Sequence, residues 1–186
     1  TGQDWALTEK PKAAKAIVKV EKVPGDNMEG LHDRGEIVNG RIRATVNEAG
    51  VISFYRDDKL ILREYFRFYG GTIVPRSRCL KILNREWKGI PGGTEYKLTV
   101  KFDANRGEKI FGMGQYQQEE LDLKYTTLEL AHRNSQASVP FYMSSLGYGF
   151  LWHNPAVGEV TFGKNYTVWR ALSTKQMDYV VIAGDT

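Results

Sequence analysis

The sequence contains a single cysteine, Cys79, so it has neither an internal disulfide framework nor a cysteine-rich zinc site. With 186 residues it is long enough to bury a hydrophobic core without either. No apolar run approaches the ~20 residues that a membrane-spanning helix needs. Residues 1–15 also lack the apolar centre of a secretory signal peptide. We therefore expect no membrane segment and a cytoplasmic location, although a signal peptide can be trimmed from a mature chain.

The sequence has little excess charge, because 26 basic and 22 acidic residues leave a net charge of only +4. One segment is basic and contains a single acid, Glu86. Such a segment could bind a nucleic acid, with the basic residues on the phosphates and Trp87 stacked on a base. The pattern is more typical of the solvated face of a strand, so we expect no nucleic-acid partner. The cations are Arg76, Arg78, Lys81, Arg85 and Lys88, and the apolar side of this strand would carry Cys79, Leu80, Ile82 and Leu83.

Helical periodicity is nearly absent, and the best helical candidate, Pro11–Lys19, runs into the β-branched Ile17 and Val18. Alternation with a period of two residues recurs instead, which is typical of half-buried strands. The apolar run Tyr179–Ala183 would suit a central strand. The alternating segments are residues 41–47, with Ile42, Ala44 and Val46 on one face, residues 97–103, with Leu98, Val100 and Phe102 on one face, and residues 159–162.

Turn residues separate these segments at 48–50, 56–59 and 145–147. Short strands joined by tight turns predict an all-β protein, an antiparallel β-sandwich with few short helices. We find no repeat and no linker, and therefore predict one domain over residues 1–186 in which residues 1–30 are loosely ordered.

Sites for cofactors and metals are not indicated. Gly112-Met113-Gly114 resembles the start of a dinucleotide-binding loop, but Gln117 occupies the third glycine position. A bend in a strand explains these small residues better. The three histidines, His32, His132 and His153, are too widely spaced for a metal motif, and we expect surface or hydrogen-bonded roles for them.

Catalytic carboxylates are also not apparent, although paired acids would carry out glycoside hydrolysis. Glu119 and Glu120 are adjacent, so on a strand they would point to opposite faces. Asp57-Asp58 lies in a predicted turn, and Asp122 and Glu129 are isolated. The aromatic content of 12% suits either sugar binding or core packing, and core packing is the commoner use.

The C-terminal half carries a more specific pattern, a series of sequence blocks in a defined order. The blocks are Glu108–Gln115, Leu121–Lys124, Glu129-Leu130, Arg133–Ser135, Val139–Tyr142, Gly147–Asn154, Val160–Gly163, Trp169, Ala171, Asp178-Tyr179 and Ala183–Thr186. Their order and spacing resemble the N-terminal domain of glycoside hydrolase family 31, over roughly residues 107–186. Many relatives have glycine after the Leu-Asp-Leu-Lys block, where this chain has Tyr125.

This resemblance implies a β-sandwich of the galactose-mutarotase-like kind that packs on a (β/α)8 barrel of the same chain. In the family the barrel supplies two aspartates that cleave α-glucosides or α-xylosides with retention. Both would lie beyond residue 186, so we expect this fragment alone to hydrolyse no glycoside. It needs no cofactor, and its expected partners are the barrel and α-linked glucose- or xylose-containing saccharides.

The resemblance also implies a contact with substrate. Relatives send the loop that matches Arg133, Asn134, Ser135 and Gln136 over the barrel mouth, where a polar side chain contacts the sugar. Without the resemblance, these residues read as a solvated hairpin loop. Two other functions stay open from the sequence: a stand-alone carbohydrate-binding module, and an aldose mutarotase-like epimerase using His132 with Glu129 as acid and base.

Overall fold

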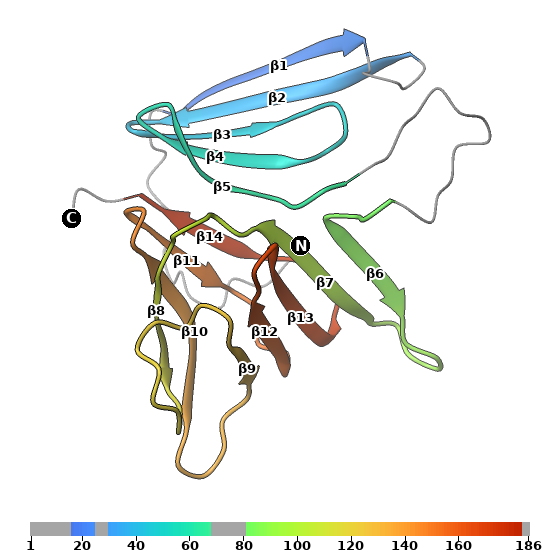
Figure 1. Cartoon of the computed structure of the whole chain (residues 1–186). Coiled ribbons are helices and arrows are strands. Elements are labelled where there is room, and N and C mark those ends of the chain that lie inside the picture. The colour runs from blue at the N-terminus through green and yellow to red at the C-terminus, as the bar shows by residue number, and fades with distance from the viewer. Residues whose placement is uncertain (1–15, 25–29, 68–80, 184–186) are drawn as a thin grey trace. The chain divides into compact units, whose positions relative to one another are not determined.

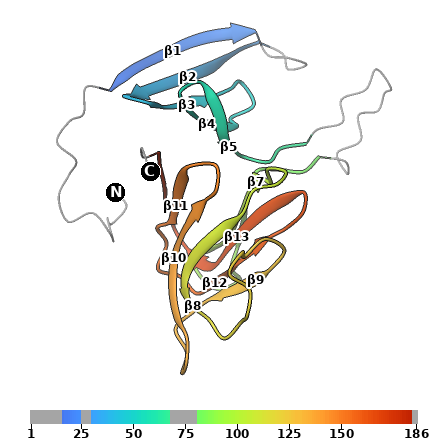
Figure 2. The ribbon, with the colours of Figure 1, turned by 60° about the vertical axis from the view of Figure 1, so that its left-hand side comes forward.

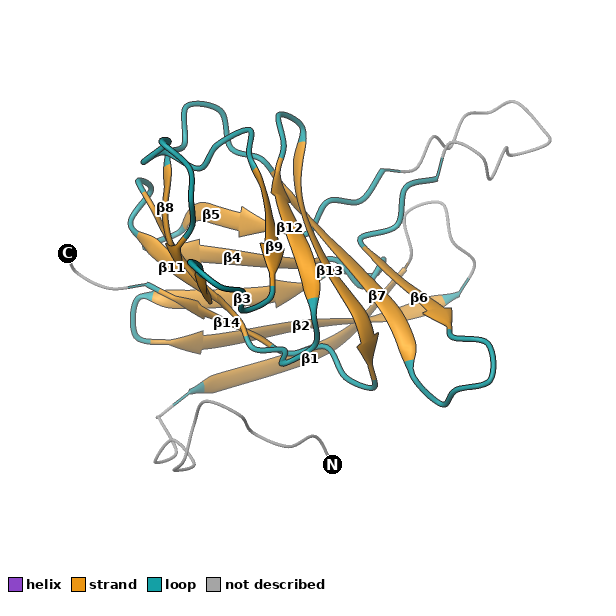
Figure 3. Cartoon of the chain, turned by 90° about the horizontal axis from the view of Figure 1, so that it is seen from below, coloured by secondary structure: helices purple, strands orange, loops and turns teal. Residues whose placement is uncertain are grey.

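The computed structural model describes residues 16–24, 30–67 and 81–183, and every regular element in them is a β-strand (Figure 3). The prediction of an antiparallel all-β fold is confirmed. No helix in the described ranges is long and apolar enough to cross a membrane. The best helical candidate, residues 11–19, lies partly outside the described residues, and it is strand from Ile17 onward. Cys79 and the basic residues Arg76 and Arg78 also lie outside them.

The chain forms two compact units, which we describe separately. One unit, here the first unit, spans residues 12–84 with 101–103 and contains a five-stranded antiparallel sheet in the order β1-β2-β3-β4-β5 (Figure 1). Its strands are β1 (Ile17–Pro24), β2 (Leu31–Asn39), β3 (Ile42–Val46), β4 (Ile52–Arg56) and β5 (Lys59–Arg63).

The second unit contains two sheets. The four-stranded sheet has the order β14-β11-β10-β8, and the five-stranded sheet has the order β6-β7-β13-β12-β9. β8, β10 and β11 lie side by side in Figure 2. The strands are β6 (Arg85–Gly89), β7 (Tyr96–Asp103), β8 (Ile110–Gln115), β9 (Thr127–Leu130), β10 (Ala137–Ser144), β11 (Tyr148–Trp152), β12 (Gly158–Phe162), β13 (Tyr166–Thr174) and β14 (Tyr179–Ile182).

The predicted turns are present with the backbone that each needs. Asp57 and Asp58, between β4 and β5, have φ angles of 47° and 63°, the positive pair that a tight type I′ hairpin requires. Gly50 and Gly147 have φ angles of 73° and 80° at the other two turns, where glycine adopts the left-handed region without steric cost.

One strand differs in position from its prediction. The apolar run at 179–183 forms β14, which pairs only with β11 among the described strands and lies at the sheet edge, not at its centre. The run is apolar on both sides because both faces of this sheet are apolar. Inward-facing Tyr142, Phe150 and Trp152 are buried, whereas outward-facing Met143 and Ile182 are 55% and 48% exposed.

This outward face, here called the outer apolar face, follows directly from the strand register. Residues paired across antiparallel strands share a face. Phe111, Met143, Gly149 and Ile182 form one cross-strand row, and Phe141, Leu151 and Val180 form the next.

The core of the second unit contains a cluster of aromatic rings and a buried ion pair. The ring of Trp169 stacks on those of Phe150 and Trp152, with centroids 5.2 and 5.5 Å away. Glu108 and Lys124 are both almost fully buried, with Lys124 Nζ 3.5 Å from Glu108 Oε2. The buried aromatic residues serve packing, and they are Tyr142, Tyr148, Phe150, Trp152, Phe162 and Trp169.

The same carboxylate accepts two short hydrogen bonds from hydroxyl groups. Ser144 Oγ donates to Glu108 Oε1 at 2.5 Å and Tyr148 Oη donates to it at 2.6 Å. Burial is the main reason that the pKa of Tyr148 lies well above its usual range, with the nearby Tyr142 and Glu108 adding to it.

Candidate functional site

The four residues predicted to contact sugar form one reverse turn between β9 and β10. The backbone N–H of Gln136 donates to the carbonyl of Arg133 at 3.2 Å, which closes the turn. Ser135 has a φ of 70°, the positive angle that a type II turn needs at its third position. Asn134 and Ser135 are exposed at the tip.

The flanking residues of the turn are held by the protein itself. Arg133 donates two hydrogen bonds of 2.5 Å to the carboxylate of Glu129, four residues earlier. These bonds lower the pKa of Glu129 and keep it charged. Gln136 Nε2 donates to the carbonyl of Ala131 at 3.0 Å. Within the described part of the chain, Asn134 is the member of the set whose side-chain amide is left for an external ligand.

A hydrogen-bonded tyrosine fixes the base of the turn. Tyr116 Oη lies 2.8 Å from the carbonyl oxygen of Glu129 and 2.7 Å from Ser138 Oγ, so it links the end of β9 to the start of β10. Burial raises the pKa of Tyr116, so its hydroxyl stays protonated at neutral pH. The turn is therefore presented by a rigid support.

Gly112-Met113-Gly114 is confirmed as a bend in a strand, with φ angles of 115°, 69° and 92°. The register between β8 and β10 shifts here, so that residues 139–141 of β10 face Met113 alone. A Cβ at Gly114 would lie 2.2 Å from the carbonyl oxygen of Ala137, which excludes a side chain. Pro140, which has no N–H to donate, is accommodated in this bulge.

A cavity of about 220 Å³ adjoins the turn, between the end of β9, the start of β10 and the loop after β11. Its polar groups are mostly committed internally. The amide of Asn154 donates to Thr174 and to the carbonyl of Gln176, and its oxygen accepts from the N–H of Ala156. The exposed His132 lies at the cavity rim.

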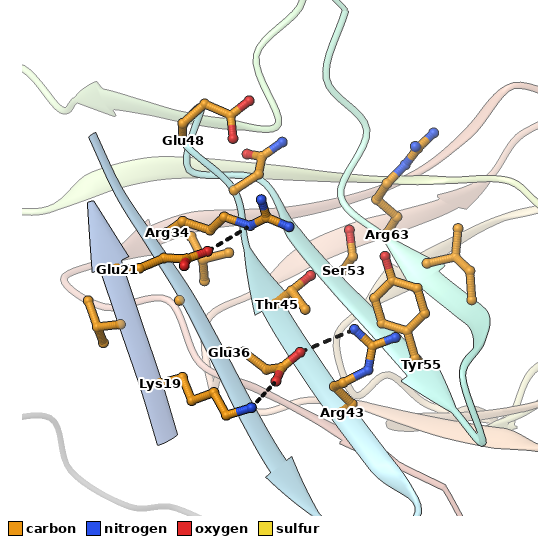
Figure 4. Close-up of a pocket in the computed structure, with 15 residues that line it drawn as sticks. Lys19, Glu21, Arg34, Glu36, Arg43, Thr45, Glu48, Ser53, Tyr55 and Arg63 are labelled. Atoms are coloured by element: carbon orange, nitrogen blue, oxygen red, sulfur yellow. Dashed lines mark hydrogen bonds and ion pairs between the residues drawn. The ribbon is translucent and has the colours of Figure 1, made fainter. Parts of the chain in front are cut away.

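A hollow of about 760 Å³ lies over one face of the sheet of the first unit (Figure 4). Its cations have acidic neighbours. Glu36 lies 3.9 Å from Lys19 and 3.3 Å from Arg43, and Glu21 lies 3.8 Å from Arg34. These ion pairs weaken the attraction of the face for a polyanion.

Within the described residues, the carboxylates that we considered as a catalytic pair are not brought together across a pocket. Glu119 and Glu120 lie in the loop between β8 and β9, not on a strand, and both are exposed. His153 is buried and its Nδ1 lies 3.0 Å from Asp178 Oδ2, which confirms a hydrogen-bonded histidine. The described residues contain no group of three or more His, Cys, Asp or Glu side chains that could hold a metal ion.

The family model that matches this chain describes the N-terminal galactose mutarotase-like domain of glycosyl hydrolase family 31, and the match covers residues 2–160. The chain belongs to this family. The family resemblance read from the C-terminal blocks is thereby confirmed, and the match extends through the N-terminal half, where the sequence pattern was unspecific.

Similar proteins include a glucosidase of this family and α-xylosidases. An uncharacterized family 31 glucosidase, ORF2, of Pseudescherichia vulneris is 50% identical over 157 residues, which are 80% of this chain and 30% of that protein. An α-xylosidase of Saccharolobus solfataricus is 30% identical over 183 residues, covering 92% of this chain and 24% of that protein.

The crystal structure of a family 31 α-xylosidase from a soil metagenome, complexed with xylose, matches the whole chain with a TM-score of 0.79 and 46% identity. The match covers 27% of that structure. The chain thus spans 24–30% of the length of these three relatives. They are neither mutarotases nor stand-alone binding modules, so the glycosidase interpretation fits and the two alternatives do not.

Sequence reasoning placed all four site residues in one loop, but it did not predict which of their side chains are hydrogen-bonded within the protein and which is left for a ligand. The spacing of Glu129 and Arg133 gave no signal of their ion pair, because residues four apart are neighbours on a helix and not on a strand. Their pairing also argues against the epimerase hypothesis, since Glu129 bonds with Arg133.

Proposed function

We propose that this chain is the N-terminal domain of a retaining α-glycosidase that acts on α-xylosides, with α-glucosides as the second candidate substrate. The observation that carries the proposal is the 46% identity over the whole chain to an α-xylosidase crystallised with xylose. The second candidate is kept because a relative that is 50% identical over 157 residues is named as an uncharacterized family 31 glucosidase. The catalytic aspartates belong to a barrel outside these 186 residues.

The domain supports that barrel through the outer apolar face. Met143 and Ile182 are each about half exposed there, and the neighbouring Phe141 and Leu151 continue the same apolar surface. Exposed apolar patches of this kind are typical of surfaces that another protein surface covers. The occupant is the remainder of the enzyme, because the chain covers 27% of the matched α-xylosidase.

Asn134 is the direct contribution of the domain to substrate binding. Its amide can donate a hydrogen bond through its NH2 group and accept one through its oxygen, so it suits a sugar hydroxyl. The residue lies at the tip of a turn whose base is held by Tyr116. Loss of one neutral hydrogen bond costs roughly 0.5–1.5 kcal/mol, which corresponds to a several-fold change in binding. The contact positions the sugar and takes no part in bond cleavage.

The test uses the full-length enzyme with aryl α-xyloside and aryl α-glucoside, and proton NMR to record the anomer released first. We expect the α-anomer, and faster hydrolysis of the xyloside. Asn134→Ala should raise KM or lower kcat/KM several-fold, with an unchanged melting temperature. Asn165→Ala, an exposed asparagine in another turn of the same unit, is the control and should have no effect.

Three results would contradict parts of this proposal separately. Release of the β-anomer would exclude a retaining mechanism. Equal kcat/KM for wild type and Asn134→Ala on both substrates would reduce the turn to a surface loop. Hydrolysis by the 186-residue chain alone would mean that the catalytic groups are inside it.

A further inference from the structure

Two aromatic side chains are exposed together on the hairpin of β6 and β7. Trp87 is 42% exposed and Tyr96 is 44% exposed. Their rings meet edge to face, with centroids 5.8 Å apart and planes at 90°. Trp87 pairs with Leu98, so Tyr96 is its diagonal neighbour on the same face. An edge-to-face pair leaves ring faces that neither partner covers.

An ion pair lies beside these rings. Lys175, in the loop between β13 and β14, places its Nζ 3.4 Å from Glu95 Oε1. The hydroxyl of Thr94 also donates to Glu95 Oε1 at 3.0 Å, and these hydrogen bonds lower the pKa of Glu95, which stays ionised. Trp87, Tyr96 and Lys175 line an open hollow of about 390 Å³, within the size range of small-ligand sites.

We propose that this aromatic platform, made by Trp87, Tyr96, Glu95 and Lys175, is a second saccharide-binding site. A pyranose ring carries C–H groups on one face and hydroxyl groups at its rim. The C–H face packs on an exposed aromatic ring and removes apolar area from water. Each hydroxyl both donates and accepts, so a carboxylate beside an ammonium group satisfies neighbouring hydroxyls.

The charges near the platform favour a neutral ligand over a nucleic acid. Glu95 neutralises Lys175. Lys88 pairs with Lys97 in the hairpin register, and this pair lies on the face opposite to Trp87. A polyanion that stacked on Trp87 would therefore meet a neutral ion pair, with the two hairpin lysines turned away.

The platform is distinct from the turn that is proposed to contact substrate. β6 and β9 are the two outer strands of the same five-stranded sheet, and the turn 133–136 follows β9. Four strand spacings separate these edges, roughly 19 Å at 4.7–4.9 Å each. One sugar ring cannot contact both sites, so the platform would hold a different residue of a polymeric ligand.

The experiment is electrophoresis of the full-length enzyme through native gels that contain dextran or xyloglucan, with hydrolysis of a small aryl α-xyloside measured in parallel. The two polymers distinguish an α-glucan from a xylose-bearing glucan as the ligand. We expect retardation by at least one of them. Trp87→Ala and Tyr96→Ala should each weaken this binding about tenfold, or about 1.4 kcal/mol, and leave aryl xyloside hydrolysis unchanged.

Matched variants keep the test specific. Lys97→Ala removes a side chain from the opposite face of the same hairpin and should bind like wild type. Trp87→Phe keeps an aromatic face and should retain part of the binding. Lys175→Ala, which lies outside the strands, should lose binding several-fold and replaces Trp87→Ala if that variant does not fold.

Absence of retardation by either polymer would overturn the proposal, as would retardation that Trp87→Ala and Lys175→Ala leave intact. Binding of a single-stranded oligothymidylate that depends on Trp87, without polymer binding, would assign the platform to nucleic acid instead. An enzyme that is retarded in a Trp87-dependent manner but hydrolyses no aryl glycoside would retain the platform and refute the proposed enzymatic function.

Discussion

Removing the ammonium group of Lys124 should destabilise the protein strongly, because it would leave the carboxylate of Glu108 buried without a counter-charge. Both side chains are almost inaccessible to solvent, and the two charged atoms are 3.5 Å apart. At an effective dielectric constant of 20, their attraction is about 5 kcal/mol. Much of this attraction offsets the cost of burying the two charges.

The expected loss for Lys124→Met is about 3 kcal/mol, at the lower end of the range for a broken buried pair. The lower end applies because Ser144 and Tyr148 continue to donate hydrogen bonds to the carboxylate. Glu108→Gln in the same background should recover part of this loss, because the amide carries no charge to compensate. The two changes should therefore be non-additive by about 2 kcal/mol in a double-mutant cycle.

Urea unfolding of the 186-residue chain, followed by tryptophan fluorescence, measures these free energies. Trp152 and Trp169 are buried in the same unit as the ion pair and report its unfolding. Lys109→Met, an exposed lysine next to Glu108, is the control and should stay within about 0.5 kcal/mol of wild type. A loss below about 1 kcal/mol for Lys124→Met, or additive double-mutant energies, would refute this reasoning.

Three further outcomes are expected. Gly158→Ala should cost about 3 kcal/mol of stability in urea unfolding, because a Cβ there would lie 1.8 Å from the carbonyl oxygen of Arg170; a normal unfolding midpoint would contradict this. Tyr125→Gly should raise stability by about 0.5 kcal/mol. Tyr125 has a φ of 72°, and the strain of a left-handed backbone at tyrosine costs more than the extra chain entropy that glycine loses on folding. A destabilised variant would contradict this prediction. Burial raises the pKa of both Tyr142 and Tyr148 in the folded state, so stability should be full below about pH 10 and fall as the pH rises above it. Melting temperatures between pH 8 and 11 measure this fall in stability. The fall should be smaller in Tyr142→Phe than in the wild type. An equal fall in the two proteins would indicate that the two hydroxyls are accessible to water.

The strand pattern was largely predictable, because one-sided burial forces alternation. Leu98, Val100 and Phe102 alternate with polar residues in β7 and are all buried. The position of β14 in its sheet was predicted wrongly, because its residues do not alternate. A run that is apolar on both faces is typical of a central strand, and local sequence does not distinguish this from an edge strand in a sheet with two apolar faces.

The turn at 133–136 could be located from sequence, but the roles of its residues could not. Which side chain is left for a ligand depends on hydrogen bonds that close only in the folded chain. Arg133 donates to the carboxylate of Glu129, and the amide of Gln136 donates to the carbonyl of Ala131. The departure at Tyr125 was visible in the sequence, but only the structure shows that this tyrosine, 72% exposed, adopts a backbone angle that glycine would favour.

The outer apolar face also governs how the isolated chain would behave in a test tube. Without the longer chain proposed above, a sheet that exposes Met143 and Ile182 to water would bind dyes such as anilinonaphthalene sulfonate and associate with other copies as its concentration rises. Dimers seen by size-exclusion chromatography of the isolated chain would then reflect the uncovered sheet, and their subunit contacts would not be those of the enzyme. Charged replacements such as Met143→Lys and Ile182→Glu would yield a monomeric fragment suited to crystallisation and to NMR.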